Sequence, residues 1–238
     1  MSTKPQGIAQ PTISQVLQEF LDEQRKRLKP RTFARYEDVI ELLQHSINGY
    51  AYNSLDEEES DIFDKLYNEQ DIEFCDIFGP EKILDNVHEF LDYFMVRKVI
   101  ASKELLKAAG TVTKKLARWL QEKGYATSEE TEIAVELGVE ATHSLPKAEE
   151  LASLLYNFAQ SQLPGKVLER VDDQFFIDRV EPGKLWLSGW LSYKGDIGPI
   201  AVPREITDLA EEGWAVTLWL GRTRRGWKIL EVGNVYPM

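Results

Sequence analysis

The sequence predicts an α+β protein with two domains, an all-helical N-terminal domain followed by a small β-barrel. Between residues 12 and 162, apolar residues recur at the three- and four-residue spacing of amphipathic helices. Beyond residue 166 they alternate with polar residues, as in half-buried strands. The segment Gln162-Leu163-Pro164-Gly165 lies where the period changes, so we place the domain boundary there.

The N-terminal end predicts an arm and a helical hairpin. Residues 1–11 contain prolines and a glycine but no periodicity, which predicts a flexible arm. Thr12 can cap a first helix, which we expect to end near residue 28 because Pro30 disfavours helical backbone in the residue before it. A second helix is expected from Pro30 to about Ile47. We call residues 20–47 the elbow.

Further helices are expected before the domain boundary. Gly79-Pro80 indicates one helix start, Ser102 can cap the next, and Gly124 can end it. Pro146 is expected in the first turn of the last helix, because that position tolerates a missing N–H. The expected helices lie around residues 62–67, from 83 to 95 and from 105 to 120, followed by two short helices that begin at Ser128 and Ser144.

The C-terminal domain is predicted to contain five strands and one short helix. Strand-like runs are rich in β-branched and aromatic residues, and two hairpin turns are expected at 181–184 and 222–226. A helix over 203–212 follows the third strand. This order predicts a small barrel of OB type, with a different five-stranded barrel or sheet as the alternative. The expected strands contain residues 175–177, 184–187, 200–202, 214–220 and 227–232.

Charge is unevenly distributed. The formal net charge is −12, which disfavours tight nonspecific binding of nucleic acid because such binding requires Lys and Arg. However, residues 51–100 hold fourteen acidic and four basic residues, whereas residues 1–50 hold six acidic and seven basic ones. We interpret the acidic run 56–59 as a solvated surface, with a basic partner or a divalent ion as the alternative.

No signature of catalysis, of a cofactor or of a metal site is found in the sequence. Cys75 is the one cysteine and has apolar neighbours, which favours a buried thiol. The three histidines lie in separate segments, and Gly-rich phosphate loops are absent. We therefore predict no catalytic residues, no metal and no cofactor. Three carboxylates near strand ends are expected to face water: Asp172, Asp173 and Asp178.

The sequence also predicts a cytoplasmic protein with no membrane partner. No apolar run approaches the roughly 20 residues that a membrane-spanning helix needs. The start MSTKPQGIAQPT lacks the apolar core of a secretory signal. The cytoplasm is therefore the expected compartment.

Two stretches suggest a family. FLDEQRKRL followed by PRTFARYEDVIELL, and later TVTKKLARWLQEKGYA, resemble the N-terminal core-binding (SAM-like) domain of tyrosine recombinases and phage integrases. The resemblance covers residues 13–47 and 103–126, and it implies an all-helical module that clamps DNA. The recombinase catalytic domain is absent, because no arginine follows His143 at the His-x-x-Arg spacing and Tyr236 has no catalytic partners. The resemblance implies DNA as a partner without recombinase activity.

The matched helices contain basic residues that could form a patch for phosphates. The ordinary structural alternative is that these residues are solvated and paired with interleaved acidic neighbours such as Glu23, Glu37 and Asp38. The predicted nucleic-acid-binding residues are Arg25, Arg27, Lys29, Arg31 and Arg35 at the elbow, with Lys114, Lys115 and Arg118 on the later helix.

The tryptophan-rich C-terminal domain offers a second candidate face. Exposed aromatic rings beside cations are typical of proteins that bind single strands, where rings stack on bases and cations contact phosphates. The alternation at 214–220 places Trp219 on the face opposite to Trp214. The alternative is that the rings only fill the barrel interior. The candidate ligand face comprises Trp190, Tyr193, Trp219, Arg222, Arg224 and Arg225.

Taken together, these features predict a non-enzymatic binding or accessory protein that contacts DNA through the recombinase-like helices. The alternative is a protein-interaction adaptor or a structural dimer that uses the acidic stretch and exposed aromatics. An enzyme with an acidic metal site is a third interpretation.

Overall fold

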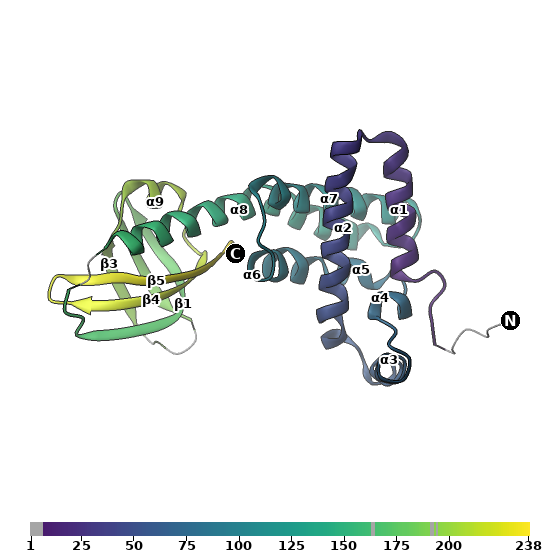
Figure 1. Cartoon of the computed structure of the whole chain (residues 1–238), viewed down its shortest axis with the longest axis horizontal. Helices are drawn as coiled ribbons and strands as arrows, with labels where there is room; N and C mark the ends of the chain where they lie inside the picture. Colours follow the sequence, from purple (N-terminus) through teal and green to yellow (C-terminus); the bar gives the residue numbers. More distant parts are fainter. Residues whose placement is uncertain (1–6, 163–164, 191–192, 194) are drawn as a thin grey trace. The chain divides into compact units, whose positions relative to one another are not determined.

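A computed structural model of the chain describes residues 7–162, 165–190, 193 and 195–238. It has helices followed by a five-stranded antiparallel sheet, so the predicted α+β class is confirmed (Figure 1). The chain forms two compact units, Met1–Thr142 and His143–Met238. The predicted arm, residues 1–11, and the predicted boundary segment, residues 162–165, lie partly outside the described residues.

The first unit is helical. The elbow forms as expected: the Thr12 and Gln15 side chains form a capping box at the start of α1, and Pro30 opens α2. The helices of this unit are α1 (Ile13–Arg27), α2 (Pro30–Tyr50), η1 (Ala51–Ser54), α3 (Glu57–Gln70), α4 (Phe74–Ile77), α5 (Lys82–Asp85), η2 (Glu89–Phe94), α6 (Met95–Arg97), α7 (Lys103–Glu122) and the first part of α8 (Ser128–Ser161).

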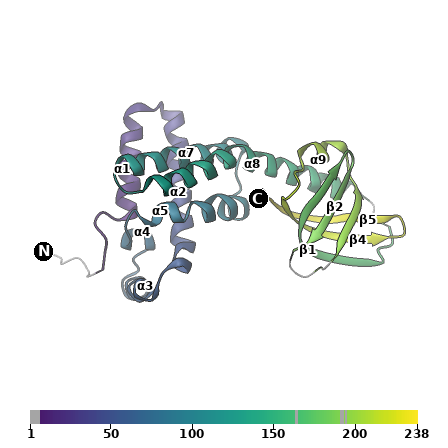
Figure 2. The same cartoon turned by 180° about the vertical axis from the view of Figure 1, so that it is seen from behind.

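Helix α7 crosses the α1–α2 hairpin (Figures 1 and 2). The Phe20 ring lies 5.4 Å from the Trp119 ring and 6.1 Å from the Tyr36 ring, measured between centroids. On its other side, α7 approaches α8 closely, since a Cβ atom at Gly110 would lie 2.4 Å from the Gly138 carbonyl oxygen. Only glycine fits this helix crossing. This crossing fixes the position of α7 in the unit.

The helix expected at 83–95 is interrupted in the structure, so this prediction was wrong. Helix α5 ends at Asp85, where Asn86 leaves the helical conformation and its side chain donates to the Lys82 carbonyl oxygen at 2.8 Å. The π-helix η2 then adds one residue to its turn. Phe90 and Leu91 lie in this π-helix and are buried, although the segment is not one continuous α-helix.

The two short helices expected from Ser128 and Ser144 form one helix, α8, with Pro146 inside it. An internal proline costs about 3 kcal/mol because it removes a hydrogen bond and crowds the preceding turn. Burial of Leu151 and Leu155, at roughly 1.5–3 kcal/mol each, offsets this cost. Tertiary packing therefore overrides the local break signal.

The second unit contains the sheet, with strands β1 (Glu169–Glu181), β2 (Lys184–Gly189), β3 (Asp196–Ala201), β4 (Ala215–Thr223) and β5 (Gly226–Tyr236), and helix α9 (Arg204–Leu209) after β3. All five expected strands and the expected helix are present. The hydrogen-bonded order is β3-β2-β1-β4-β5, with every pair antiparallel. The long strand β1 pairs with β4 along its first half and with β2 along its second.

The sheet is not closed, so the predicted barrel was wrong. Strands β3 and β5 approach each other at the two edges, but they share no hydrogen-bonded ladder. Strand β3 has only six residues and includes Pro199, which has no N–H to donate. A bulge between Ile177 and Arg179 bends β1 and curls the sheet.

One face of the sheet forms the core of this unit. It packs against the C-terminal part of α8, which contributes Leu151 and Leu155, and against Ile206 of α9. Sheet residues in this core include Phe175, Ile177, Leu187, Val216, Leu218, Leu220 and Ile229. The opposite face of β1 and β4 is therefore left to solvent. None of the helices in the described ranges is long and apolar enough to span a membrane.

Candidate ligand-binding face

The solvent face of the sheet displays indole rings. Along β4, Val216, Leu218 and Leu220 point into the core, whereas Trp219 is 39% exposed. Trp214, just before the strand, is 4% exposed and belongs to the core. The alternation therefore sorts the tryptophans as predicted, and core filling does not account for Trp219.

A second exposed indole lies beyond the end of β2. Trp190 is 44% exposed, and its ring stacks on the Phe176 ring with centroids 4.8 Å apart and planes 25° from parallel. Its backbone N–H donates to the Gln174 carbonyl oxygen at 2.9 Å, which fixes the ring next to β1. Trp186 differs, because the Arg179 guanidinium covers its ring at 3.8 Å. Trp190 is thus the available ring at this end.

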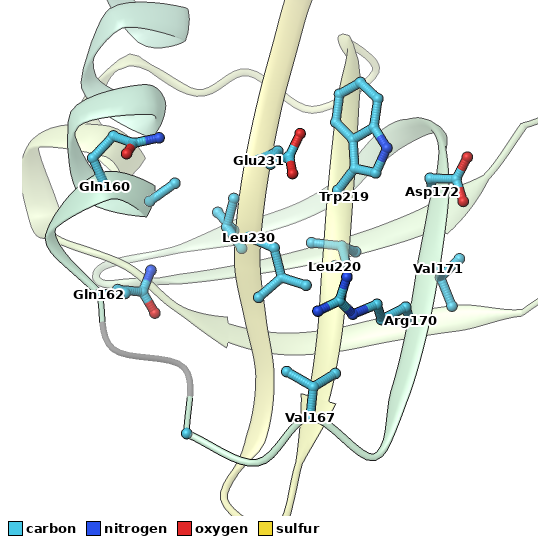
Figure 3. Close-up of a pocket in the computed structure, with 13 residues that line it drawn as sticks. Gln160, Gln162, Val167, Arg170, Val171, Asp172, Trp219, Leu220, Leu230 and Glu231 are labelled. Carbon is cyan, nitrogen blue, oxygen red and sulfur yellow. The ribbon is translucent and has the colours of Figure 1, made fainter.

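Trp219 forms part of a hollow of about 540 Å³. In the register of the sheet, Asp172 on β1 and Glu231 on β5 are its two neighbours, and Figure 3 shows the ring between these carboxylates. Two residues further along β4, Gly221 lies between Arg170 on β1 and Lys228 on β5. An acidic row therefore adjoins a basic row on one face. The hollow is also lined by Gln160, Gln162, Val167, Leu220, Leu230 and others.

Gln162, just after the end of α8, lines the same hollow (Figure 3). Both its side-chain nitrogen and its side-chain oxygen are buried and have no hydrogen-bond partner within the part of the chain that the structure describes. Buried amide groups are normally hydrogen-bonded, and leaving one unpaired costs about 1–3 kcal/mol. A polar ligand in the hollow would satisfy this amide.

A basic hollow lies at the β4–β5 turn. It measures about 510 Å³, and its described lining is Gly165, Lys166, Leu168, Thr223, Arg224, Arg225 and Lys228. This described lining contains four cations and no carboxylate. The Thr223 hydroxyl orders the turn, since it accepts from the Arg225 N–H at 3.1 Å and donates to the Gly226 carbonyl oxygen at 2.8 Å.

Two residues of the predicted ligand face lie elsewhere. Arg222 pairs with Glu169 at 3.5 Å and does not line the basic hollow. Tyr193 packs against the core of this unit, its ring 6.4 Å from that of Phe175, and its N–H donates to Asp173 at 2.7 Å. Both positions differ from the prediction because burial and ion pairing depend on neighbours that are distant in sequence.

Two of the predicted elbow cations are paired with carboxylates. Arg25 pairs with Glu37 at 3.2 Å, and Arg35 lies 3.7 Å from Asp38. Lys123 pairs with both Glu19 and Glu23, at 2.7 and 2.6 Å. The Lys123 ammonium, followed by the Trp119 N–H, holds the pKa of Glu23 below its ordinary value.

The other predicted elbow cations have no ion pair in the described segments. Arg27 donates to the side-chain oxygen of Gln24 at 2.7 Å, and Lys29 and Arg31 are exposed. On α7, Lys115 and Arg118 are exposed and Lys114 is half-buried. Glu104, near the start of α7, has a lowered pKa, because its own backbone N–H, then the Ser102 side chain and also Arg35 favour its carboxylate. Lys123, just after the end of α7, pairs with Glu23 of α1.

Neither a metal site nor a reactive cysteine is supported by the described residues. Within the described ranges, no group of three or more His, Cys, Asp or Glu side chains is placed to hold a metal ion. Cys75 is buried, as expected, and burial raises the pKa of its thiol far above the ordinary value. It is therefore a poor nucleophile at neutral pH.

Comparisons with family models, with characterised proteins and with solved structures find no match to this chain. The resemblance to recombinase core-binding domains therefore stays a prediction. Sequence reasoning had no means of finding Gln162, because its role depends on the position where α8 ends relative to the sheet. Arg170 had a weak signal, since it alternates with Asp172 and Gln174 at the period of a strand.

Proposed function

We propose that this chain is a non-enzymatic nucleic-acid-binding protein that holds a single strand on the solvent face of its sheet. The observation that supports this most directly is the pair of exposed indoles, Trp190 and Trp219, on the face opposite to the core. Indole rings left in water beside cations are suited to stacking on bases, because every base offers an aromatic face.

The spacing of the rings suits an extended strand. Trp219 pairs with Asp172 on β1, and Trp190 stacks on Phe176, four residues further along the same strand. Four residues span roughly 14 Å at ~3.4 Å per residue. Two bases separated by a few nucleotides can therefore stack on the two indoles at once, and the strand would run along β1.

The charges of the second unit favour the same ligand. The basic hollow lies at the Trp219 end of this face, and Arg170 lies in the row next to the ring. Most of the excess negative charge of the chain is in residues 51–100, which belong to the first unit. The total of −12 therefore does not describe the surface around Trp219.

A binding assay with labelled single-stranded and duplex DNA in about 50 mM salt tests the proposal, because low salt favours phosphate contacts. We expect a complex with the single strand that weakens as salt is added. If neither DNA binds, the nucleic-acid proposal is overturned. The adaptor alternative is then tested by a solution mass measurement and a pull-down.

The elbow offers a second DNA contact, which the predicted recombinase resemblance favours. Lys29 and Arg31 are exposed without ion pairs in the described ranges, and α7 adds Lys115 and Arg118. If this surface grips a duplex, charge reversal by R31E should weaken duplex binding and lower its dependence on salt. Unchanged duplex binding would remove the elbow from the function.

A further inference from the structure

Building on the proposed function of this face, we propose that the Trp219 hollow and the basic hollow together bind one terminal nucleotide. The base would stack on Trp219, and its phosphomonoester would lie among Lys166, Arg224, Arg225 and Lys228. The same ligand chemistry can come from the phosphorylated end of a strand or from a free nucleoside monophosphate.

The two hollows adjoin. Gly165 lines both of them, and the register places Lys228 opposite Gly221, two residues along β4 from Trp219. That step is roughly 7 Å, from ~3.4 Å per residue. Leu230 of β5 lies over Gly221, since a Cβ atom there would lie 3.0 Å from a Leu230 methyl carbon, so the two hollows meet at Gly165 and not above Gly221. One nucleotide can reach from the first hollow into the second.

The charges give this nucleotide an orientation. Asp172 and Glu231 flank the ring, so a phosphate is repelled from that row, whereas base amino groups can donate to these carboxylates. Arg170 and Lys228 form the next row and attract the phosphate. The base is therefore expected over the acidic row and the phosphate over the basic one.

The unpartnered amide of Gln162 is an independent sign of a ligand in the first hollow. It presents one buried donor group and one buried acceptor with no partner among the described residues. A base edge offers donors and acceptors side by side, and glutamine amides pair with such edges in two hydrogen bonds. A base edge can therefore satisfy both atoms of the Gln162 amide at once.

The cation count favours a terminal phosphate over one inside a strand. A phosphomonoester has a charge of about −1.5 to −2 and three acceptor oxygens, whereas an internal phosphodiester has a single charge. Four cations that converge in a described lining without a carboxylate repel one another until an anion binds. A phosphomonoester, with its larger charge and three acceptor oxygens, can therefore bind more of these four cations than a phosphodiester can.

The test compares an oligodeoxyadenylate with a hydroxyl end, with a 5′-phosphate and with a 3′-phosphate, and adds deoxyadenosine monophosphate as a competitor, because adenine has the amino group that the two carboxylates would accept from. We expect one phosphorylated end to bind about tenfold more tightly than the hydroxyl form, or ~1.4 kcal/mol. The preference should diminish below about pH 6, where the phosphomonoester gains a proton.

Substitutions show which side chains produce the preference for a phosphorylated end. Double substitution R224Q and K228Q should abolish the preference for the phosphorylated end while the hydroxyl form still binds. The matched control is R204Q, on α9 in the same unit, where Arg204 is exposed and lies 3.7 Å from Asp208. It removes one positive charge away from the hollows and should leave the preference intact. Thermal unfolding of each variant checks that the fold is retained.

The outcomes separate the two proposals. Equal binding of all three strands, together with no competition by the mononucleotide, overturns the terminal site but leaves single-strand binding intact. Direct binding of the mononucleotide, measured by calorimetry, without binding of any strand supports the terminal site, assigns it to a free nucleotide and overturns the proposed function. Absence of binding by strands and mononucleotide overturns both.

Discussion

The basic hollow at the β4–β5 turn and the elbow both contain clustered cations, but within the described residues only the elbow has carboxylates among them. In the elbow, Arg25 and Arg35 have carboxylates within 4 Å. In the basic hollow, Arg224, Arg225 and Lys228 share the described lining with no carboxylate. Arg35 and Asp38 lie three residues apart on one helix, and Arg25 and Glu37 meet between α1 and α2, whereas the described lining of the basic hollow offers no carboxylate. The arrangement of charges therefore indicates a binding surface better than their number does.

The aromatic residues show the same contrast. Trp119, in the first unit, is 6% exposed, and its N–H donates to Glu23 at 2.8 Å. Its hydrogen bond and its packing are both satisfied inside the protein. The ring of Trp219 is open to water on the sheet face. A tryptophan that stabilises the fold and a tryptophan available to a ligand are thus distinguished by exposure and by partners.

The largest expected effect comes from removing the exposed indole. W219A should lower the affinity for single-stranded DNA about tenfold or more, since base stacking on an aromatic residue contributes roughly 1–3 kcal/mol. Fluorescence anisotropy with a labelled strand measures this. The matched control is Y52A, which removes a ring that is 47% exposed in the first unit. If both variants lose the same affinity, the contrast between the regions is broken.

W190A tests the second stacking position. It should reduce the affinity for a long strand, which can reach both indoles, more than the affinity for a strand of two or three nucleotides. The reason is that the rings are separated along β1, so a short strand occupies only one of them. Titrations with strands of increasing length measure the difference, and an equal loss at every length would contradict stacking at two positions.

A smaller effect is expected from salt dependence. Neutralising Arg224 and Lys228 should reduce the slope of log affinity against log salt by about 0.7 for each phosphate of the single strand that these side chains no longer neutralise. Charge reversal of Arg31 should leave the single-strand slope unchanged. A change in that slope with R31E would mean that the elbow, and not the turn, binds the strand.

The smallest effect concerns pH and the elbow. The depressed pKa of Glu23 means that its carboxylate stabilises the folded state above its ordinary value of 4.5, and that this contribution is lost as pH falls below it. Thermal unfolding should therefore be more sensitive to acid in the native protein than in E23Q. Identical acid profiles for the two proteins would show that the Lys123 pair has no measurable role in stability.

Local patterns predicted the local features. Thr12 and Pro30 predicted the elbow, and the two-residue period of a strand placed Trp219 opposite to Trp214. What failed depended on distant contacts. Closure of the barrel required hydrogen bonds between β3 and β5, which do not form.

The candidate site could be predicted only in part. Trp190, Trp219, Arg224 and Arg225 were expected on the ligand face because their types and spacing are informative. Its other side chains come from the end of α8, from the segment before β1 and from the start of β1, and only folding brings them together. Those residues are Gln160, Gln162, Lys166 and Arg170.

Helix α8 has a consequence for folding cooperativity. Its first part contributes Ala134 and Ala141 to the buried residues of the first unit, and its last part contributes Leu151 and Leu155 to the core of the second. Separating the chain at Thr142 would cut one helix and leave a frayed end in each fragment. The two cores are thus completed by a single helix, and we expect one calorimetric unfolding transition instead of two.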